Sequence, residues 1–293
     1  MNVYHLRYQK YLEVFENYTQ NYLSKLNTRP EVLGESMKYS LLGGGKRIRP
    51  ILALACAEML ELPAEEILPF ALALEMIHTY SLIHDDLPAM DDDDFRRGQP
   101  TNHKKYGEAN AILAGDGLLN EAYSICFSEC MKGEKYVLAS KYLNECAGIY
   151  GMIAGQSADL YFSEQNKDIN EEDLLYIDAH KTGKLLLAPI VMVSILKENR
   201  YYLELERFGK LLGRLFQMTD DILDVTGNFE QLGKNVGKDE GKNKITCVRL
   251  YGLEGAKIRA DMCAKDCHAV LECIDGDTSF LHELVDYVLN RQN

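Results

Sequence analysis

The sequence has 293 residues, of which 46% are hydrophobic and 26% are charged. This composition is typical of a globular protein and excludes a collagenous, fibrous or intrinsically disordered chain. Its 32 basic and 45 acidic residues give a formal net charge of −13, so a broad basic surface for nucleic acid or anionic membranes is not expected. An anionic ligand would have to be held by a local group of basic side chains or by a metal ion.

The apolar segments predict neither a membrane span nor a secretory signal. The longest, Leu185 to Leu196, covers twelve residues and contains Pro189, whereas a span needs about 20 apolar residues. The first thirty residues contain no continuous apolar stretch, so we expect a cytoplasmic protein. None of the eight cysteines forms a Cys-x-x-Cys pair, and in a reducing compartment we expect them to be small buried side chains.

Apolar residues recur at spacings of three and four along most of the chain, a pattern that predicts helices. We expect an all-α fold without strands, with helices at residues 3–26, 30–42, 47–60, 64–87, 108–131, 136–163, 171–197, 201–226, 246–251, 254–274 and 278–290. Loops are expected at residues 43–45, 91–102, 163–170 and 227–243. Because no low-complexity linker separates these segments, residues 1–293 are predicted to form a single domain.

The first loop with chemical character is Gly43-Gly44-Gly45, which is followed by Lys46, Arg47, Ile48 and Arg49. Glycines allow backbone N–H groups to approach an anion closely, and Lys46 and Arg49 can add charge-assisted hydrogen bonds. The segment lacks the Ser or Thr of a P-loop, and Ile48 breaks a dinucleotide-binding fingerprint. Such a turn is more often structural on its own, so its interpretation as a phosphate site depends on the motifs that accompany it.

A first carboxylate cluster occupies Asp85-Asp86-Leu87-Pro88-Ala89-Met90-Asp91. On a continuous helix Asp91 would be turned by about 240° from Asp85, so the two side chains could not bind the same ions. Pro88 disfavours helical geometry at the preceding residue, so we expect the helix to end there and the loop to fold Asp91 back. The acidic run leads directly into Arg96-Arg97, which is not typical of a solvated acidic loop.

A second carboxylate cluster consists of Asp220, Asp221 and Asp224. Asp220 and Asp224 lie one helical turn apart, about 40° around the axis. Three converging carboxylates repel one another unless a cation lies between them, and oxygen ligands alone suit Mg²⁺, which keeps waters and shares phosphate oxygens. A solvated acidic helix face is the alternative, and the apolar neighbours Phe216 and Ile222 argue against it.

Together these segments resemble the trans-isoprenyl diphosphate synthases. The matching motifs are Gly44-Gly45-Lys46-Arg47-Ile48-Arg49-Pro50, His78, Asp85-Asp86-x4-Asp91 followed by Arg96-Arg97-Gly98, Gly155-Gln156 with Asp159, Lys181-Thr182-Gly183, Phe216-Gln217 with Asp220-Asp221-x2-Asp224, and Lys234 with Lys244. They extend from about residue 32 to residue 255 in the order found in the family. Within it, the chain looks most like the bacterial farnesyl diphosphate synthases, whose first motif carries the two-residue insertion seen here as Pro88-Ala89.

The resemblance implies a helical bundle around a central cavity, with the two aspartate motifs facing each other across its mouth. It implies that isopentenyl diphosphate is bound by Lys46, Arg49, His78 and Arg97. It implies that the allylic diphosphate is bound by Arg96, Lys181, Thr182, Gln217, Lys234 and Lys244. It further implies that about three Mg²⁺ ions are held by Asp85, Asp86, Asp91, Asp220, Asp221 and Asp224.

The implied activity is the condensation of isopentenyl diphosphate with dimethylallyl and geranyl diphosphates to give farnesyl diphosphate. Ionisation of the allylic C–O bond is followed by attack of the alkene and loss of a proton. Lys181, Thr182 and Gln217 are the implied catalytic residues, the last two as oxygen dipoles turned toward the cation. Family members are commonly homodimers, so a homodimer is expected.

Product length is expected to depend on Tyr80 and Ser81. Tyr80 is five residues before Asp85, about 7.5 Å along a helix, where an aromatic residue in the family is associated with a cavity floor that stops elongation at fifteen carbons. The alternative is a core aromatic, which is the commoner role of a Tyr on an apolar helix. A geranyl or geranylgeranyl diphosphate synthase is therefore the nearest alternative.

Two other classes of protein fit less well. A terpene cyclase would carry an Asn/Ser/Glu motif in the later helix, where Asp220-Asp221-x2-Asp224 stands. A non-catalytic partner subunit typically lacks one aspartate motif, and both are present here. Cys263, Cys267 and His268 could be drawn together as zinc ligands, although one helical pair with no second pair makes buried side chains the better interpretation. Cys247 replaces the usual aromatic residue, and no motif is recognised after about residue 255.

Overall fold

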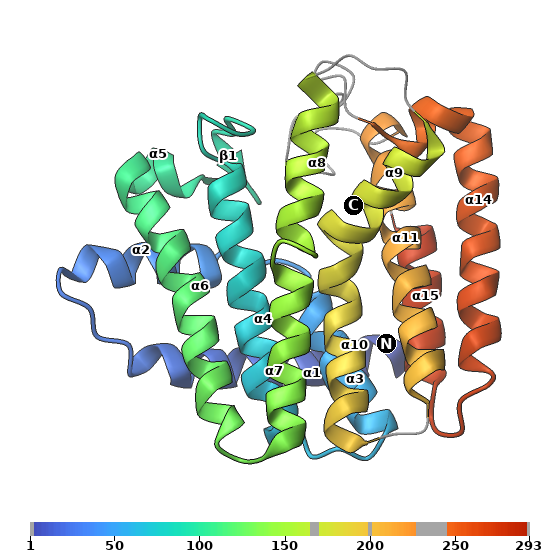
Figure 1. The fold of residues 1–293 in the computed structure, drawn as a ribbon, viewed down its shortest axis with the longest axis horizontal. Coiled ribbons are helices and arrows are strands. Elements are labelled where there is room, and N and C mark those ends of the chain that lie inside the picture. Colours follow the sequence, from blue (N-terminus) through green and yellow to red (C-terminus); the bar gives the residue numbers. More distant parts are fainter. Residues whose placement is uncertain (1–2, 165–169, 199–200, 227–244, 292–293) are drawn as a thin grey trace.

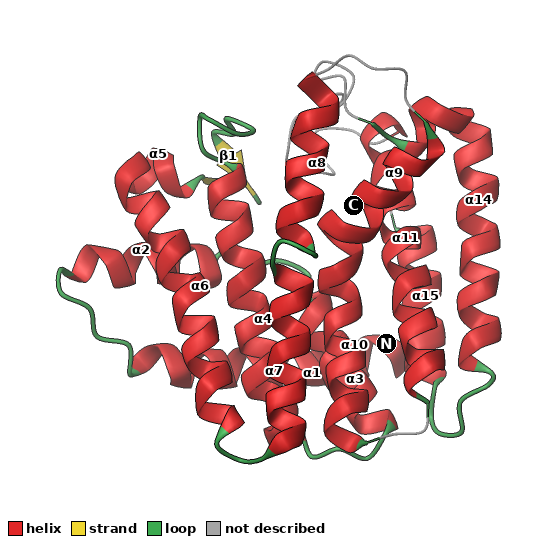
Figure 2. Cartoon of the chain, in the orientation of Figure 1, coloured by secondary structure: helices red, strands yellow, loops and turns green. Residues whose placement is uncertain are grey.

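The computed structural model describes residues 3–164, 170–198, 201–226 and 245–291. In these ranges the chain is almost entirely helical (Figure 2). The first helices are α1 (Val3–Ser24), α2 (Glu31–Leu41), α3 (Ile48–Met59), α4 (Ala64–Asp85), α5 (Asn102–Tyr106), α6 (Glu108–Cys130) and α7 (Glu134–Ala147). They are followed by α8 (Met152–Glu164), α9 (Glu171–Ile177), a π-helical segment (Asp178–Gly183), α10 (Lys184–Lys197), α11 (Tyr202–Thr226), α14 (Cys247–Leu271) and α15 (Ser279–Asn290). The all-α prediction is therefore confirmed.

Three apolar helices, α3, α4 and α10, form the centre of the bundle. α4 packs against α3, α6 and α10, and α10 also packs against α7 and α11. Buried side chains cover nearly all sides of these three helices, which is the pattern of a helix enclosed by protein. Helix α11 by contrast is amphipathic and packs its apolar side against α10 and α14. Helices α4, α6, α7, α10, α11 and α14 stand roughly side by side in Figure 1, whereas α1 runs across behind them.

Two segments, Ala64–Asp85 and Glu171–Lys197, are long and apolar enough to cross a membrane by length and composition alone. In the fold, 78% and 67% of their most apolar windows are buried inside the protein. Both therefore have the surroundings of core helices, since protein side chains already cover their apolar faces.

The predicted helix 136–163 is wrong, because the structure divides it into α7 and α8. The chain turns at Gly148–Gly151 between them. A Cβ at Gly151 would lie 2.1 Å from the carbonyl oxygen of Cys146, so only glycine allows this close return of the backbone. The apolar spacing continues on both sides of the turn and therefore does not reveal the break.

The predicted helix 171–197 is continuous in space but contains the π-helical segment Asp178–Gly183. Glycines on neighbouring helices make room for its wider turn. A Cβ at Gly155 of α8 would lie 2.1 Å from the backbone nitrogen of Lys181, and one at Gly213 of α11 would lie 2.7 Å from the Cα of Gly183. Such π segments are frequent at functional sites.

The prediction that residues 91–102 form a loop without strands is wrong. Strands β1 (Phe95–Arg96) and β2 (Gln99–Pro100) pair antiparallel through a two-residue turn, in which Arg97 (φ 54°) and Gly98 (φ 74°) are left-handed. Helix α5 was also not predicted. The expected break between residues 251 and 254 is confirmed, since Gly252 has non-helical angles (φ 71°, ψ 163°) within α14. Loop 227–243 and most of loop 163–170 lie outside the described residues.

Candidate active site

Basic groups from the glycine loop, α3 and the β-hairpin meet at one place. The guanidinium of Arg97 donates a hydrogen bond to the carbonyl oxygen of Gly44. A Cβ at Gly45 would lie 2.5 Å from the guanidinium carbon of Arg97, so the loop needs glycine at this contact. Arg49 Nε is buried and has no hydrogen-bond partner within the described structure. It is thus a donor available to a bound anion.

The electrostatics of this cluster favour an anion. Burial holds the pKa of His78 well below its ordinary value, and Arg49 and Arg97 add to this effect. Burial also lowers the pKa of Lys46 and brings that of Arg49 to about 10. A negative ligand would relieve the repulsion among these groups. Arg47 differs, because it is held in a buried ion pair with Glu75 at 2.9 Å and is structural.

The first carboxylate cluster begins where α4 ends. The backbone N–H of Asp91 donates to the carbonyl oxygen of Asp85 at 2.8 Å, so the segment after Pro88 folds back on the helix end, as the sequence predicts. The pKa of Asp85 is raised to about 6 by burial, with a further contribution from Asp91, while Lys181 opposes the shift. The two side chains therefore belong to one electrostatic site.

Asp86 has different surroundings from its neighbour Asp85. Its side chain is buried, and both carboxylate oxygens accept hydrogen bonds from Arg96 Nε, at 2.8 and 2.9 Å. Arg96 Nη2 adds a third contact of 2.6 Å. This forked ion pair occupies both carboxylate oxygens of Asp86. In this structure Asp86 therefore fixes Arg96 at the end of β1 and does not line the cavity that contains Asp85.

The second carboxylate cluster lines a cavity of about 180 Å³. Its walls carry Asp220, Asp221 and Asp224 together with Asp159, Asp178, Lys181 and Gln217. Asp221 is buried and accepts hydrogen bonds from the Cys247 backbone N–H at 2.7 Å and from Gln217 Nε2 at 2.9 Å. Burial nevertheless raises the pKa of Asp221 to about 6. Crowding of this kind is relieved by a bound cation.

Lys181 and Thr182 project from the π-helical segment and link both clusters. Lys181 forms an ion pair with Asp159 of α8 and also lines the cavity that contains Asp85. Thr182 Oγ1 donates to Gln217 Oε1 at 2.8 Å, and Gln217 in turn donates to Asp221. This chain of hydrogen bonds fixes the orientation of the Gln217 amide with its oxygen toward Thr182.

A cavity of about 410 Å³ is lined by Asp85 of the first cluster and shares Lys181 with the cavity of the second cluster. Its polar walls include Arg49, His78, Asp85, Lys181 and Thr182, and its apolar walls include Leu82, Met152, Ile153, Leu160 and Leu185. Tyr80 and Ser81 also line it. The Tyr80 side chain is 6% exposed, and its buried hydroxyl has no partner among the described residues. The cavity can therefore accept a molecule with an anionic head and a hydrocarbon body.

The donors present suit Mg²⁺ bound jointly by protein and ligand. Within the described ranges, no three His, Cys, Asp or Glu side chains form a group that could hold a metal ion alone. The carboxylates that line the cavities, Asp85 in one and Asp220, Asp221 and Asp224 in the other, supply oxygen ligands only. Mg²⁺ typically uses one or two carboxylates and completes its shell with water and phosphate oxygens.

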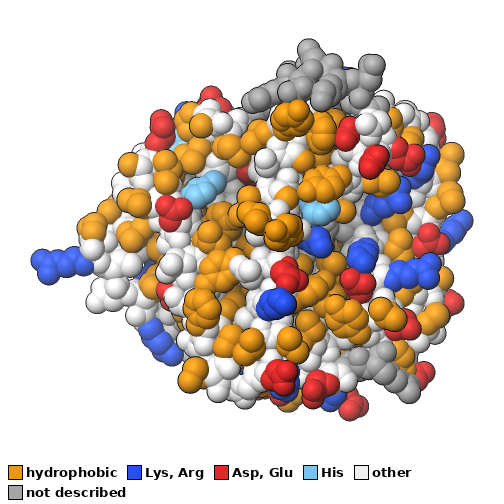
Figure 3. Space-filling model, in the orientation of Figure 1, with side chains coloured by type: hydrophobic (Ala, Val, Ile, Leu, Met, Phe, Trp, Pro, Cys, Tyr) orange, Lys and Arg blue, Asp and Glu red, His pale blue; other side chains and the backbone are white. Residues whose placement is uncertain are grey.

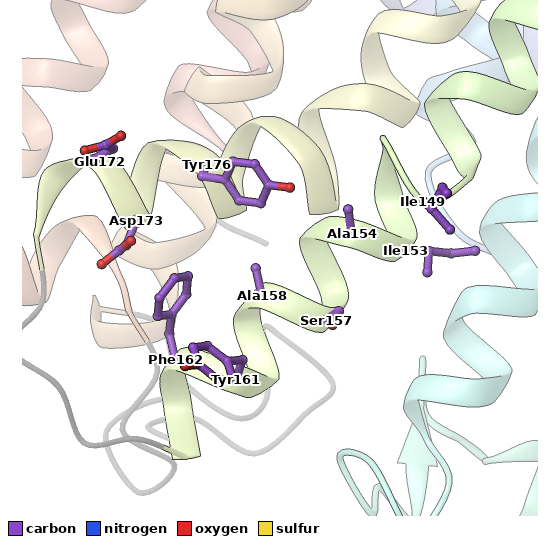
Figure 4. Close-up of a pocket in the computed structure, with 10 residues that line it drawn as sticks. All are labelled: Ile149, Ile153, Ala154, Ser157, Ala158, Tyr161, Phe162, Glu172, Asp173 and Tyr176. Carbon is purple, nitrogen blue, oxygen red and sulfur yellow. The ribbon is translucent and has the colours of Figure 1, made fainter.

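A larger hollow, about 670 Å³, is a different groove between α8 and α9 (Figure 4). It is lined by apolar and aromatic side chains, with Glu172 and Asp173 at one end. No residue predicted for the functional site lines it. It adjoins the 410 Å³ cavity through Ile153 and Ser157, which line both. Size alone therefore does not identify the functional cavity.

Not every sequence-predicted residue can be located in the site. Lys234 and Lys244 lie outside the described residues. Lys46, Asp86, Asp91, Arg96 and Arg97 line neither the 410 Å³ nor the 180 Å³ cavity. The zinc alternative is not supported, because Cys263 Sγ contacts the carbonyl oxygen of Leu211 at 3.3 Å while His268 faces His282 and Asp286.

Two charged residues near the second cluster were not predicted. Asp178 is buried in the π-helical segment, and burial and the nearby Asp221 raise its pKa well above the ordinary value. Arg291 follows α15 and pairs with Asp220 at 2.7 Å. Neither belongs to a recognisable motif, and the only sequence signal for Arg291 is a basic residue directly after an apolar helix.

Residues 30–272 match the polyprenyl synthetase family. The chain is 42% identical over 274 residues to a farnesyl diphosphate synthase of Micrococcus luteus, covering 93% of this chain and 94% of that protein. It is 43% identical over 270 residues to geranylgeranyl pyrophosphate synthase 7 of Arabidopsis thaliana, covering 90% and 78% of the two chains. The structure resembles the Helicobacter pylori geranyltransferase complexed with magnesium and isoprenyl diphosphate, with a TM-score of 0.86, 34% identity and coverage of 99% and 97%.

Proposed function

The chain belongs to the polyprenyl synthetase family, and from this we propose that it is a trans-prenyltransferase that makes farnesyl diphosphate. It condenses isopentenyl diphosphate first with dimethylallyl diphosphate and then with geranyl diphosphate. The observation that carries the proposal is the 410 Å³ cavity, which joins cations, a buried carboxylate and an apolar wall. An allylic diphosphate has a matching division into a charged head and a hydrocarbon chain.

We assign isopentenyl diphosphate to the cationic side of the cavity. Lys46, Arg49, His78 and Arg97 would bind its diphosphate directly, since burial and mutual repulsion make these groups favour an anion. His78 would take part as a neutral imidazole, because its pKa lies well below the ordinary value. The unpartnered Nε of Arg49 supports this assignment.

We assign the allylic diphosphate to the carboxylate side. About three Mg²⁺ ions would be held by Asp85, Asp91, Asp220, Asp221 and Asp224. Asp86 would contribute indirectly, by fixing Arg96 through their ion pair. Arg96, Lys181, Thr182, Gln217, Lys234 and Lys244 would complete the site for this substrate. The magnesium in the Helicobacter pylori geranyltransferase complex supports the choice of metal.

The residues of this chain would guide a reaction in which the allylic C–O bond breaks to release diphosphate, a C–C bond forms to the alkene of isopentenyl diphosphate, and the released diphosphate takes up the proton that is lost. Bound Mg²⁺ supplies neutralisation of the charge that develops on the departing diphosphate. Arg96 and Lys181 stabilise the same charge from the protein. The Thr182 hydroxyl, which lines the cavity, would turn its oxygen toward the developing carbocation, and Gln217, whose amide oxygen accepts from Thr182, would hold it in place. Both groups are too weakly nucleophilic to trap the cation. The apolar walls exclude water, which would otherwise capture the cation.

Geranylgeranyl diphosphate is the alternative product. The 43% identity to a geranylgeranyl pyrophosphate synthase is as high as that to the farnesyl diphosphate synthase, so overall similarity does not decide chain length. Tyr80 favours fifteen carbons, because its buried ring lines the cavity five residues before Asp85. We further propose a single domain, a homodimer, a cytoplasmic location, and no binding to nucleic acid or spanning of a membrane.

The proposal is tested by incubating the purified protein with dimethylallyl diphosphate, labelled isopentenyl diphosphate and Mg²⁺, and separating the dephosphorylated products by length. A fifteen-carbon product that disappears in excess chelator is the expected result. A metal-dependent product of ten or twenty carbons would retain the reaction and contradict the assigned chain length. Absence of product with every allylic starter, or activity that persists in chelator, would overturn the proposed reaction.

A further inference from the structure

The guanidinium of Arg291 occupies a buried position against the end of α11. Its side chain is only 2% exposed. Nη2 donates to the Phe216 carbonyl oxygen at 2.6 Å, and Nε and Nη2 donate to Thr219 Oγ1 at 3.1 and 2.7 Å. The Phe216 ring lies 3.9 Å from the guanidinium carbon. These contacts fix the plane of the guanidinium from the protein side.

Arg291 also makes an ion pair with the second carboxylate cluster. Nη2 lies 2.7 Å from Asp220 Oδ1, and the Asp220 side chain is 43% exposed. Asp220 lines the same cavity as Asp221 and Asp224. A buried charge is costly unless it is paired and hydrogen-bonded, and Asp220 supplies the negative partner here. The ion pair therefore holds one oxygen of a carboxylate that otherwise faces the cavity.

The position of Arg291 also connects the two substrate sides. The pKa of Lys46 is lowered by burial and by Arg291, while Asp220 raises it. Lys46 is therefore within electrostatic reach of both members of the ion pair. The end of the described chain thus lies where the proposed isopentenyl diphosphate cations meet the carboxylate cluster.

We propose that Arg291 is a positioning residue for divalent-cation binding: it holds Asp220 Oδ1 so that the other carboxylate oxygen is presented to the cation. This inference rests on the proposed function. Hydrogen-bonded partners of metal-ligating carboxylates typically change metal affinity by about 10- to 100-fold when they are removed. Phe216 and Thr219 restrain the guanidinium independently of Asp220, so Arg291 acts as a fixed support and not as a competing cation that must leave.

The guanidinium fork is essential to this role. Arginine presents several donors in one plane, and lysine presents one compact charge. Arg291→Lys keeps the charge but cannot contact Phe216, Thr219 and Asp220 together. Arg291→Met removes both features, and Thr219→Val keeps the arginine but removes one of its restraints. The three variants therefore separate charge from orientation.

The test is a titration of the full-length chain with Mn²⁺ in the presence of inorganic diphosphate, which supplies the phosphate oxygens that complete the metal site. Free Mn²⁺ is measured by electron paramagnetic resonance, and a titration of diphosphate without protein is subtracted. Arg291→Met is expected to weaken binding by about 10-fold or more, with smaller losses in Arg291→Lys and Thr219→Val. Arg7→Met is the matched control. It removes an arginine that ties α1 to Glu58 and Asp277, far in sequence from the carboxylates, so it should reduce thermal stability without changing Mn²⁺ affinity.

Several outcomes would overturn the inference. Both Arg291→Lys and Thr219→Val retain a positive charge at the site. If these two variants bind Mn²⁺ with wild-type affinity, Arg291 is a merely structural residue. Tighter binding in any Arg291 variant would make it a competing cation. Should Arg291→Met fail to fold, these two milder variants decide the question. Failure of the wild-type chain to bind Mn²⁺ even with diphosphate present would instead contradict the proposed metal-dependent function.

Discussion

Environment, more than residue type, distinguishes the acidic side chains of the site. Asp85 and Asp86 are adjacent in sequence, but Asp85 lines the cavity while Asp86 is enclosed by the guanidinium of Arg96. Lys181 and Arg96 therefore offset only part of the cost of burying the negative charge of Asp85. Such a group destabilises the metal-free protein and favours a bound cation.

Asp85→Asn is expected to stabilise the protein in chelator. The pKa of Asp85 is raised from 3.8 to about 6, so the folded state binds its proton more tightly than the unfolded chain does. The free energy of unfolding of the wild type therefore falls as pH rises from about 4 to about 6. That of the variant does not fall in this way, because Asn carries no charge. At about pH 7.5 the variant should be more stable by on the order of 3 kcal/mol.

Urea unfolding across this pH range in chelator measures the effect. The two proteins should converge below about pH 4, and added Mg²⁺ should stabilise the wild type more than the variant. Asp116→Asn, which changes an exposed carboxylate, is the control and should leave stability nearly unchanged. A destabilised Asp85→Asn in chelator at neutral pH would contradict the argument.

Tyr80 is expected to set the depth of the cavity. Replacing its buried ring by a methyl group in Tyr80→Ala extends the apolar space beyond the cavity wall. The main product should then shift from fifteen to twenty or more carbons. Tyr80→Phe is the matched control, because the ring remains and the hydroxyl that it loses has no described partner. Product chromatography reads out both variants, and an unchanged length in Tyr80→Ala would place the floor elsewhere.

At the level of elements, the sequence predicts most helices but not the irregular segments that shape the site. The apolar spacing of three and four in 171–197 is compatible with both an α- and a π-helical turn, so Asp178–Gly183 could not be recognised. The hairpin contains two residues per strand, too few for an alternating pattern. Its turn depends on left-handed angles at Arg97 and Gly98, of which only the glycine is a signal.

Gly155 is expected to be essential for the π-helical segment. In Gly155→Ala the new methyl group would lie 2.1 Å from the backbone nitrogen of Lys181, so α8 and this segment must separate. Displacement of Lys181 and Thr182 should reduce kcat by about 100-fold, and the strain should lower the free energy of unfolding by about 1–3 kcal/mol.

Steady-state kinetics and thermal unfolding together test this prediction. Gly255→Ala in α14 is a control, because its nearest new contact is the Tyr251 Cβ at 3.1 Å, and we expect its stability to change by less than about 1 kcal/mol. Wild-type kcat in Gly155→Ala would show that the close approach of α8 is not required for the site.

At the scale of the whole molecule, the sequence predicts the aspartates of the two carboxylate clusters but not the side chains from distant helices that pair with them. Pro88 is sufficient to infer that Asp91 returns to the end of α4, because that inference concerns one short loop. The pairing of Arg291 with Asp220 joins residues 71 positions apart through the packing of α15 on α11. No local pattern encodes such a contact, since it depends on the arrangement of the complete bundle.

The outer face of α6 and α7, with the turn after α7, carries exposed apolar side chains, and we predict that a second copy of the chain packs there. Phe127 and Met131 are 71% and 88% exposed, and Leu113, Val137, Leu138, Ile149 and Tyr150 are also exposed. Hydrophobic side chains gather on the face seen in Figure 3, where α6 and α7 lie at the front (Figure 1). Apolar patches of this kind mark interaction surfaces, and a second copy is the partner expected for this family.

Phe127→Glu should therefore convert the protein to a monomer, because a charge would be buried without a partner in the interface. Light scattering coupled to size exclusion should give twice 33.2 kDa for the wild type and 33.2 kDa for the variant. Met262→Glu, at a position of α14 that is 60% exposed, controls for the added charge and should remain dimeric. A dimeric Phe127→Glu would move the interface to another face, and a monomeric wild type would contradict the homodimer itself.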